Sequence, residues 1–378
     1  MEKVYEDSLE LHRRHGGKLE VKSKVPLKNR ADLSLAYTPG VAEVSRVIGA
    51  DKKLAYDYTL KKNSVAVISD GSAILGLGNL GAEAALPVME GKCALFKEFG
   101  GIDAFPLCLA TQEPEEIIAT VKAVAPVFGG INLEDISAPR CFGILARLRE
   151  ELDIPVIHDD QQGTAVVVLA ALINSLRVLG REKEKVKVVI NGAGAAGIAI
   201  GRMLLAYGFM DLILLDSKGV IGARRGDLSK EKFELAARTN LAGISGGLSE
   251  AIRGADIFIG VSKPGVLSGE MVRSMNQRPI VLAMANPVPE IMPGEALLAG
   301  AAIVGTGRSD FPNQVNNVLV FPGIFRGALD NRVKKITDAM LLAAAENIAR
   351  SVETPDAEKI LPDVFDKKVV AAVAAAIK

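Results

Sequence analysis

The stretch KVVINGAGAAGIAI, residues 187–200, decides the fold. It opens with a short apolar run, Lys187 to Ile190, of the kind that forms a buried strand, and it then becomes glycine-rich. Three glycines stand in the spacing GxGxxG, namely Gly192, Gly194 and Gly197. The bare spacing is weak evidence because glycines also serve ordinary turns, so the surrounding chain has to decide.

The chain that follows has the order of a dinucleotide-binding βαβ unit. A helix is predicted up to about Tyr207, and the next strand, Asp211 to Leu215, ends at an acidic residue, Asp216. In such a unit the glycines permit a tight turn and a close backbone approach, and the helix N-terminus attracts a pyrophosphate. We therefore predict a Rossmann domain that binds NAD or NADP at the loop residues Gly192, Gly194, Ala195, Ala196 and Gly197.

The choice between the two nucleotides stays open. Asp216 is predicted to accept hydrogen bonds from the ribose hydroxyls, which favours NAD because a carboxylate repels the additional phosphate of NADP. Ser217 and Lys218 follow directly, however, and could accommodate that phosphate.

A second GxGxxG stands earlier in the chain, at Gly76, Gly78 and Gly81. Its apolar lead, Ala73 to Leu75, is short, and Pro87 interrupts the region behind it. We interpret this copy as a structural turn that could still shape a substrate pocket.

Composition sets the wider frame. The chain has 378 residues, 49% of them apolar, which is enough for two cores, and its 45 acidic and 45 basic residues balance, so no global charge recruits nucleic acid or a membrane surface. Its cysteines, Cys93, Cys108 and Cys141, show no CxxC spacing, which disfavours a disulfide framework and a zinc site. The N-terminus does not resemble a secretory signal, and the apolar run Ala165 to Ile173 is too short for a membrane helix. We expect a cytoplasmic protein with a small-molecule ligand and a buried helix at that run.

Both halves of the chain show an alternation of strands and helices, which predicts the α/β class. A long apolar helix, Thr164 to Leu179, leads into the charged segment Arg181 to Lys187, and this change of composition marks a boundary. The predicted domains are residues 1–160 and residues 161–378, with the C-terminal helices able to pack back on the first. The other predicted strands are Val65–Ser69, Ala104–Leu109, Ile154–His158, Asp256–Gly260, Ile280–Met284 and Ala301–Val304, and the other helices are Val4–His15, which could serve a dimer, Pro114–Ala125, Cys141–Leu152, Ile336–Ser351 and Asp366–Lys378.

Two acidic pairs stand at turns. Glu134 and Asp135 lie in GGINLEDISAPR, which we interpret as a loop, and Asp159 and Asp160 end the strand IPVIH. Either pair alone would more readily be a solvated loop acid or a helix cap, but the two together suit a hard divalent ion, Mg²⁺ or Mn²⁺. His158 beside them is expected to be a core histidine rather than a ligand.

A lysine and a tyrosine are candidate proton carriers. Lys92 lies in the apolar segment MEGKCALFKEF, and burial beside a cation would lower the pKa of Lys92 toward neutrality, as a general base requires. An exposed lysine is the alternative, above all for Lys97. Tyr37 stands at the turn YTPG, where a packed phenol is the default but a phenol could donate a proton if a lysine shared its pocket.

These segments together resemble the malic enzyme family in its short prokaryotic form. The resemblance implies a two-domain α/β fold, with an N-terminal domain like that of amino-acid dehydrogenases and a C-terminal NAD(P)-binding Rossmann domain, in a homodimer. It runs from about Tyr37 to Asp330 and rests on YTPGVAEV, SDGSAILGLGNLG, GKCALFKEFGGIDAFPLC, NLEDISAPRCF, HDDQQGTAVV, NGAGAAGIAI, LLDSKGVI, MANPVPE and GTGRSDFPNQVNNVLVFPGIFRGALD.

The resemblance also implies an activity and a set of roles. The activity is the oxidative decarboxylation of (S)-malate to pyruvate and CO₂ with reduction of NAD or NADP, dependent on Mg²⁺ or Mn²⁺, together with decarboxylation of oxaloacetate. We also count Thr164 and Asn286 as candidate cofactor contacts. The implied roles are Tyr37 as general acid, Lys92 as general base, Glu134, Asp135 and Asp160 as metal ligands, Asp159 as a carboxylate just outside the ligand set, and Asn286, Asn317 and, less firmly, Asn316 as contacts of the substrate carboxylate.

One position departs from the family. Larger eukaryotic members have an arginine for malate where this chain has Ala73. Either the asparagines and the metal carry more of the binding, or a basic residue elsewhere substitutes.

Two other functions stay open at this point. A metal-free two-domain dehydrogenase of amino acids or folates would not need the acidic residues, and a nonenzymatic nucleotide sensor would need neither Lys92 nor Tyr37.

Overall fold

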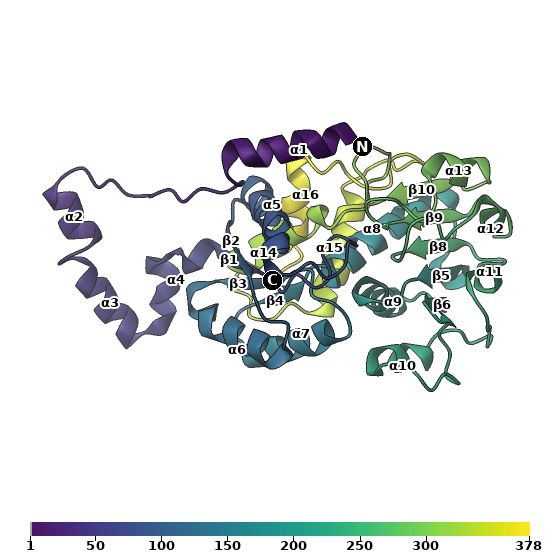
Figure 1. Cartoon of the computed structure of the whole chain (residues 1–378), viewed down its shortest axis with the longest axis horizontal. Helices are drawn as coiled ribbons and strands as arrows, with labels where there is room; N and C mark the ends of the chain where they lie inside the picture. The colour runs from purple at the N-terminus through teal and green to yellow at the C-terminus, as the bar shows by residue number, and fades with distance from the viewer. Residues whose placement is uncertain (1) are drawn as a thin grey trace.

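The structure is a computed structural model and describes residues 2–378. Two β-sheets, one from each half of the chain, form its centre, with helices around them (Figure 1). This arrangement confirms the predicted α/β class.

The first sheet has the strand order β2-β1-β3-β4, and all its neighbours are parallel. Parallel strands end at the same edge of a sheet, so the loops that follow β1, β3 and β4 meet there. The strands are β1 (Ser64–Ser69), β2 (Asp103–Cys108), β3 (Gly130–Leu133) and β4 (Val156–His158), and the connecting helices are α5 (Ala82–Gly100), α6 (Pro114–Val124) and α7 (Arg140–Glu151).

Strand β3 corrects the interpretation of GGINLED as a loop. The two glycines are needed for packing rather than for a turn, because a Cβ on Gly130 would lie 2.8 Å from the Phe325 ring and one on Gly129 would lie 2.4 Å from Leu329. Because the side chains of a helix lie this close, only glycine fits at these positions. The strand therefore lacks the larger apolar side chains from which a strand is usually predicted. Glu134 and Asp135 accordingly follow a fully buried strand.

Pro87 does not interrupt its segment either, because helix α5 continues through it. The proline stands in the second turn, where it removes one internal hydrogen bond and leaves the rest of the helix intact. Its helix thereby reaches Lys92 in the buried middle of the domain.

The second sheet has the order β10-β9-β8-β5-β6-β7, parallel except for β7. Its central strand β5 leads into α9, as the sequence predicts for a Rossmann βαβ unit. The strands are β5 (Lys187–Asn191), β6 (Asp211–Asp216), β7 (Gly219–Val220), β8 (Ile257–Gly260), β9 (Ile280–Ala283) and β10 (Ile303–Thr306), and the helices are α9 (Ala195–Tyr207), α10 (Lys230–Ala236), α11 (Leu248–Ala251), α12 (Gly269–Arg273) and α13 (Pro293–Leu298).

Helix α8 (Gln162–Leu179) lies between the two sheets. Its length and apolar composition would suffice to cross a membrane, but 67% of it is buried inside the fold, as in the core helix of a globular protein. This confirms the predicted buried helix.

The C-terminal helices return to the first sheet. Phe321 and Phe325 pack against Phe96 of α5 with ring centroids 4.7 and 5.4 Å apart. These helices are α14 (Phe321–Asp330), α15 (Asp338–Arg350) and α16 (Lys367–Ala374), and the short 3-10 turns of the fold are η1 (Lys52–Leu54), η2 (Leu60–Asn63), η3 (Ala125–Val127), η4 (Lys183–Lys185) and η5 (Asn317–Leu319).

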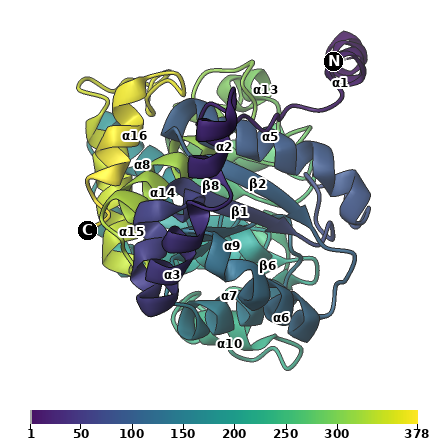
Figure 2. The same ribbon diagram turned by 90° about the vertical axis from the view of Figure 1, so that its left-hand side faces the viewer.

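The N-terminal segment forms an arm that stands off this body (Figures 1 and 2). It comprises α1 (Glu2–His15), which confirms the predicted helix, followed by α2 (Arg30–Ala36), α3 (Val41–Ala50) and α4 (Ala55–Tyr58). None of the residues in the last three helices is buried. The arm therefore contributes little to the core of its own chain, mainly the partly buried Tyr56 of α4.

Candidate active site

Lys92 lies at the carboxyl edge of the first sheet, between two carboxylates. Its Nζ is 2.7 Å from Oδ2 of Asp159 and 3.0 Å from Oε1 of Glu134, and all three side chains are buried. The ammonium also stands 4.3 Å from the centre of the Phe321 ring. Lys92 is therefore the buried lysine that the sequence singles out, whereas Lys97 is exposed and pairs with Asp103.

The pKa of Lys92 lies above its ordinary value. Burial alone would lower this pKa, but the charges of Asp159 and Glu134 outweigh it. The sequence-based expectation of a lowered pKa assumed a neighbouring cation, and the described neighbours are anions. Lys92 can work as a base only when a cation takes up the charge of these carboxylates.

The acidic residues meet around Lys92 from two adjacent loops. The backbone N–H of Asp135 donates to Oδ2 of Asp160 at 2.9 Å, and Asn132 donates to Glu134 at 2.8 Å. Burial, with repulsion among them, raises the pKa of Glu134, of Asp135 and of Asp160. Bringing several carboxylates into a buried space is unfavourable without a compensating cation.

A divalent ion fits this donor set. Among the described residues no three acidic or histidine side chains already stand in metal-binding geometry. Buried Oδ2 of Asp135 and Oδ1 of Asp159 nevertheless have no hydrogen-bond partner. Oxygen-only donors of this kind suit Mg²⁺ or Mn²⁺.

His158 is part of the core, as predicted. It is fully buried, and burial lowers the pKa of His158 to about 4, so the ring is neutral at pH 7. Its Nδ1 lies 3.6 Å from Asp160.

Asn317 lies beside this cluster. A Cβ on Gly163 would lie 1.8 Å from Oδ1 of Asp159 and 3.3 Å from Cβ of Asn317, so the two side chains meet over this glycine. Asn316 instead accepts a hydrogen bond from Val318 N–H at 2.9 Å and caps η5. The Asn316 side chain is therefore already used to cap this turn.

Asn286 lies in the loop after β9 of the second sheet. A Cβ on Gly76, which has φ +75°, would lie 2.8 Å from the Asn286 carbonyl oxygen. The first GxGxxG therefore forms a turn, as predicted, and this turn touches the loop that carries Asn286. The backbone N–H of Thr164, in the first turn of α8, donates to the carbonyl oxygen of Asp159 at 3.1 Å.

The nucleotide loop has the shape that its glycines predict. A Cβ on Gly192, which has φ +118°, would lie 2.4 Å from Val261 O, and one on Gly197 would lie 1.8 Å from Gly192 O. Nothing lies within 4 Å of the corresponding position at Gly194, and this residue caps α9 without a side-chain hydrogen bond. Free space and unpaired N–H groups at Ala195 therefore meet at a helix N-terminus, which suits a pyrophosphate.

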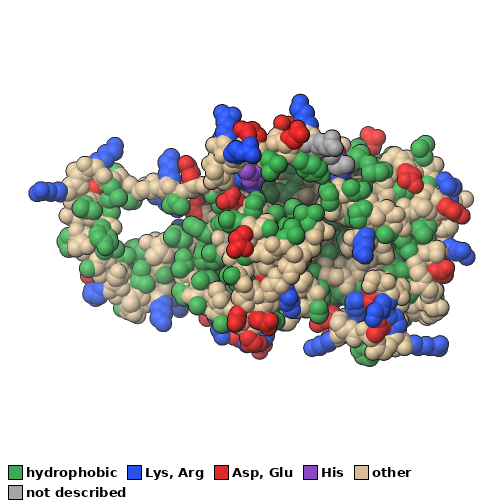
Figure 3. Space-filling model, in the orientation of Figure 1, with side chains coloured by type: hydrophobic (Ala, Val, Ile, Leu, Met, Phe, Trp, Pro, Cys, Tyr) green, Lys and Arg blue, Asp and Glu red, His purple; other side chains and the backbone are tan. Residues whose placement is uncertain are grey.

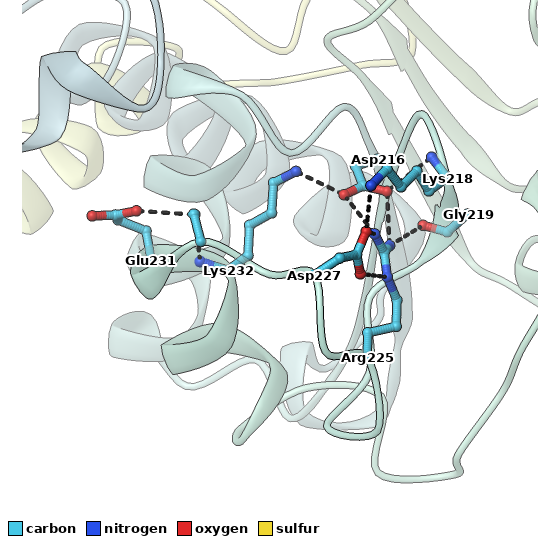
Figure 4. A network of polar contacts seen from close by, with 8 residues as sticks. Asp216, Lys218, Gly219, Arg225, Asp227, Glu231 and Lys232 are labelled. Atoms are coloured by element: carbon cyan, nitrogen blue, oxygen red, sulfur yellow. Dashed lines mark hydrogen bonds and ion pairs between the residues drawn. The ribbon is translucent and has the colours of Figure 1, made fainter.

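Asp216 ends β6 as predicted, but its oxygens are already occupied (Figure 4). Oδ1 accepts from Lys218 N–H at 3.0 Å and from Arg225 at 2.8 Å, and Oδ2 accepts from Arg225 at 3.2 Å and from Lys232 at 2.7 Å. A carboxylate offers about four acceptor positions. Ribose hydroxyls can therefore bind Asp216 only if one of these donors moves away.

Arg225 and Lys232 also change the electrostatic potential around Asp216. Burial acts against ionisation, but the hydrogen bonds from Arg225 and Lys232 lower the pKa of Asp216 to about 2. The Asp216 carboxylate is therefore not a lone negative charge that would repel the NADP phosphate. The loop that supplies Arg225 lies outside the βαβ unit, and neither Arg225 nor Lys232 was predicted from the sequence.

Tyr37 is not brought to Lys92 within one chain. It ends α2 in the arm, and its side chain is 67% exposed. Figure 1 shows α2 far from the first sheet.

The fold and this site together define a class of protein. The chain combines a Rossmann sheet that has an open pyrophosphate loop with a buried lysine among carboxylates that can hold a divalent ion, a combination expected of nicotinamide-dependent oxidoreductases that use a metal ion.

Comparisons with known proteins identify the family within this class. The model for the malic enzyme N-terminal domain matches residues 16–115 and 110–149, and that for the malic enzyme NAD binding domain matches residues 161–378. The bifunctional malic/malolactic enzyme of Bacillus subtilis is 56% identical over 375 residues, which cover 98% of this chain and 92% of that protein. The crystal structure of the NAD-dependent malic enzyme of Thermotoga maritima has 53% identity and a TM-score of 0.95, with 98% of both chains covered.

The chain therefore belongs to the malic enzyme family. Its similar relatives include enzymes named for either nucleotide, such as the NAD-dependent malic enzyme of Geobacillus stearothermophilus, 56% identical over 96% of this chain and 76% of that protein. The NADP-dependent malic enzyme of Escherichia coli is 46% identical over 96% of this chain and 50% of that longer protein. The chain is thus an NAD(P)-dependent oxidoreductase.

Proposed function

We propose that this enzyme converts (S)-malate and NAD(P)⁺ to pyruvate, CO₂ and NAD(P)H with the help of a divalent metal ion. The observation that carries the proposal is the position of Lys92, within 3.0 Å of two carboxylates in a buried cluster of acids. A metal-free dehydrogenase would have no use for this cluster. A nucleotide sensor would have no use for the buried lysine.

Glu134, Asp135 and Asp160 would hold the ion, with Asp159 beside them. When bound, Mg²⁺ or Mn²⁺ supplies a Lewis acid that stabilises negative charge on the substrate oxygens. Asp159 keeps its contact with Lys92 and orients the ammonium group.

Lys92 takes the proton of the C2 hydroxyl of malate as the C2 hydride passes to the nicotinamide. Oxaloacetate, formed in place, loses its C4 carboxylate as CO₂, and the same site would decarboxylate oxaloacetate supplied from solution. Asn317, next to Asp159, and Asn286, on the loop after β9, hold the substrate. Amides can donate to a carboxylate without adding a charge to the site.

Tyr37 then protonates the enolate, and it comes from a second copy of the chain. None of the residues of α2, α3 and α4 is fully buried, and Leu35 is 79% and Val21 is 94% exposed. Hydrophobic side chains are visible on the surface of the arm (Figure 3). Short helices are marginal in water without packing, so this arm needs a partner surface. A homodimer supplies one, and it also supplies the proton donor that each site lacks.

Both nucleotides serve as hydride acceptors in this proposal. The pyrophosphate binds at Gly194 and Ala195, and the cations around Asp216 offer donors to the additional phosphate of NADP. Three free cysteines agree with a reducing compartment such as the cytoplasm.

The proposal is tested by following NAD(P)H absorbance with (S)-malate and Mn²⁺, with and without EDTA, while pyruvate is assayed. Lactate is measured in parallel because a relative is named for malolactic activity. Pyruvate formed in step with NAD(P)H and abolished by EDTA supports the proposal. Lactate without NAD(P)H, or no product at all, contradicts it.

A further inference from the structure

Glu290, in the segment MANPVPE, is a fully buried carboxylate that the chemistry above does not use. Its Oε1 accepts a hydrogen bond from the backbone N–H of Ser262 at 2.9 Å, and its Oε2 accepts one from the backbone N–H of Ala285 at 3.0 Å. Ser262 belongs to the loop after β8 and Ala285 to the loop after β9. One carboxylate therefore ties two neighbouring loops at the carboxyl edge of the second sheet.

Two backbone hydrogen bonds reinforce this tie. Gly265 N–H donates to Pro289 O at 3.2 Å, and Leu267 N–H donates to Glu290 O at 3.1 Å. Three hydrogen bonds thus join the two loops, one of which depends on the Glu290 side chain, and the fourth, from Ala285, holds the Glu290 side chain against its own loop.

The loop after β8 contacts the nucleotide loop. Asn191 Nδ2 donates to Ser262 Oγ at 2.9 Å, and Val261 O lies against Gly192, whose missing side chain makes the approach possible. A shift of Ser262 would therefore disturb the turn where the pyrophosphate is expected.

The loop after β9 carries Asn286, directly after Ala285. The backbone of Asn286 lies against Gly76 of the first domain, and its side chain lies against Gly307, where a Cβ would be 2.8 Å from Nδ2. Contacts therefore run from the nucleotide loop through Ser262 and Glu290 to Asn286.

Strand β8 is shaped to admit the Glu290 side chain. A Cβ on Gly260 would lie only 2.4 Å from Cδ of Glu290. Any other residue at 260 would push the carboxylate out of its place between the loops.

We propose that Glu290 is a positioning residue that holds Asn286 in register with the nucleotide loop, so that the bound malate faces the nicotinamide. The inference rests on the proposed function, because it takes Asn286 as a contact of the substrate carboxylate. An amide at position 290 would keep the shape but would present N–H₂ to one of two backbone N–H groups, which cannot accept a hydrogen bond. One loop then moves.

The test is a double-mutant cycle on kcat/KM for malate. Glu290→Gln and Asn286→Ala are each expected to lower it about 10- to 100-fold, mainly by raising the KM for malate, since small displacements of a substrate contact have effects of this size. Because Glu290 acts through Asn286, the kcat/KM of the double variant is expected to equal that of the less active single variant. If the two substitutions instead caused independent structural damage, the loss of kcat/KM in the double variant would be the product of the two single losses.

Glu295→Gln is the matched control. Glu295 also accepts a hydrogen bond from a backbone N–H, that of Gly269 at 3.1 Å, but it joins α13 to α12 away from Asn286. This variant is expected to keep kcat/KM within about twofold of wild type, as surface changes usually do. If Glu290→Gln does not fold, Gly260→Ala replaces it in the cycle, because it displaces an unchanged glutamate.

Three results would overturn the inference: multiplicative losses in the cycle, a Glu290→Gln enzyme equal to the Glu295→Gln enzyme, or an Asn286→Ala enzyme with wild-type KM for malate. In each case wild-type pyruvate formation still stands. Failure of the proposed function would appear separately, as a wild-type enzyme that makes no pyruvate from malate.

Discussion

Nζ of Lys92 and Oδ2 of Asp159 are 2.7 Å apart in a buried space, on two segments separated by 67 residues of sequence. The two groups are joined as an ion pair until a proton leaves the lysine. Burial opposes the charge of each group, so the ion pair is favourable only while the two groups keep this close geometry.

Replacing Lys92 by methionine is expected to lower kcat by about 10²- to 10⁴-fold, the usual contribution of a general base. Steady-state kinetics with malate and Mn²⁺ measures the loss. Lys97→Met is the matched control, because Lys97 stands on the same helix but is exposed and pairs with Asp103. Equal activity of the two variants would show that Lys92 takes no part in the reaction.

Removal of the metal is expected to lower the melting temperature as well as the activity. A ligand that binds only the folded state stabilises it by about 2.7 kcal/mol at 100 times its Kd. Calorimetry with Mn²⁺ or EDTA measures the shift, and Asp135→Asn is expected to abolish it. The exposed Glu113→Gln variant should shift like wild type. A melting temperature that does not respond to Mn²⁺ in wild type would contradict the metal site.

Arg225 and Lys232 are expected to support NADP more than NAD. A hydrogen bond to a charged group is worth about 1.5 to 3 kcal/mol, so Lys232→Gln should lower the ratio of kcat/KM for NADP to that for NAD by about 10- to 100-fold. Lys230→Gln changes the lysine that begins the same helix and is not among the donors to Asp216, so it should leave the ratio unchanged. A ratio unaffected by Lys232→Gln would show that the phosphate binds elsewhere.

Tyr37 and Lys92 of different copies are expected to share a site. Mixed dimers of a Tyr37→Phe chain and a Lys92→Met chain, isolated through two different affinity tags, then have one intact site of two. They should show about half of the wild-type activity per dimer, although each parent is inactive. If both residues came from one chain, the mixed dimers would be inactive.

Asp103 is expected to make the free energy of unfolding depend on pH in the acid range. Burial alone would raise the pKa of Asp103, but hydrogen bonds from Lys97, Lys24 and Asn63 lower it to about 2 from an ordinary value of 3.8. A lowered pKa means that the added stability is complete above about pH 4 and is lost as the pH falls toward 2. Urea unfolding of wild type and Asp103→Asn should therefore differ at pH 5 and converge toward pH 2.

Sequence alone predicted what depends on local geometry. The turn at Gly192 and the helix behind it follow from neighbouring residues, and so does the acidic end of β4 at Asp159. Strand β3 was missed because Gly130 makes room for Phe325, which lies almost 200 residues further along the chain. Packing of this kind leaves no local pattern.

The site was predictable in its residues but not in its arrangement. Lys92 and the acids were identified from their segments, whereas the pairing of Lys92 with Asp159 depends on where α5 meets the end of β4. The cations around Asp216 come from a loop with no repeating pattern. The exposure of Tyr37 depends on an arm that stands off the body of its own chain, which no local pattern around Tyr37 indicates.

The most direct test is a coupled assay with purified enzyme, (S)-malate, Mn²⁺ and either nucleotide, in which NAD(P)H and pyruvate are counted in the same sample. One pyruvate for each NAD(P)H, lost with EDTA and restored by Mn²⁺, is the predicted result. NAD(P)H without pyruvate, or turnover that EDTA leaves unchanged, would contradict metal-dependent oxidative decarboxylation.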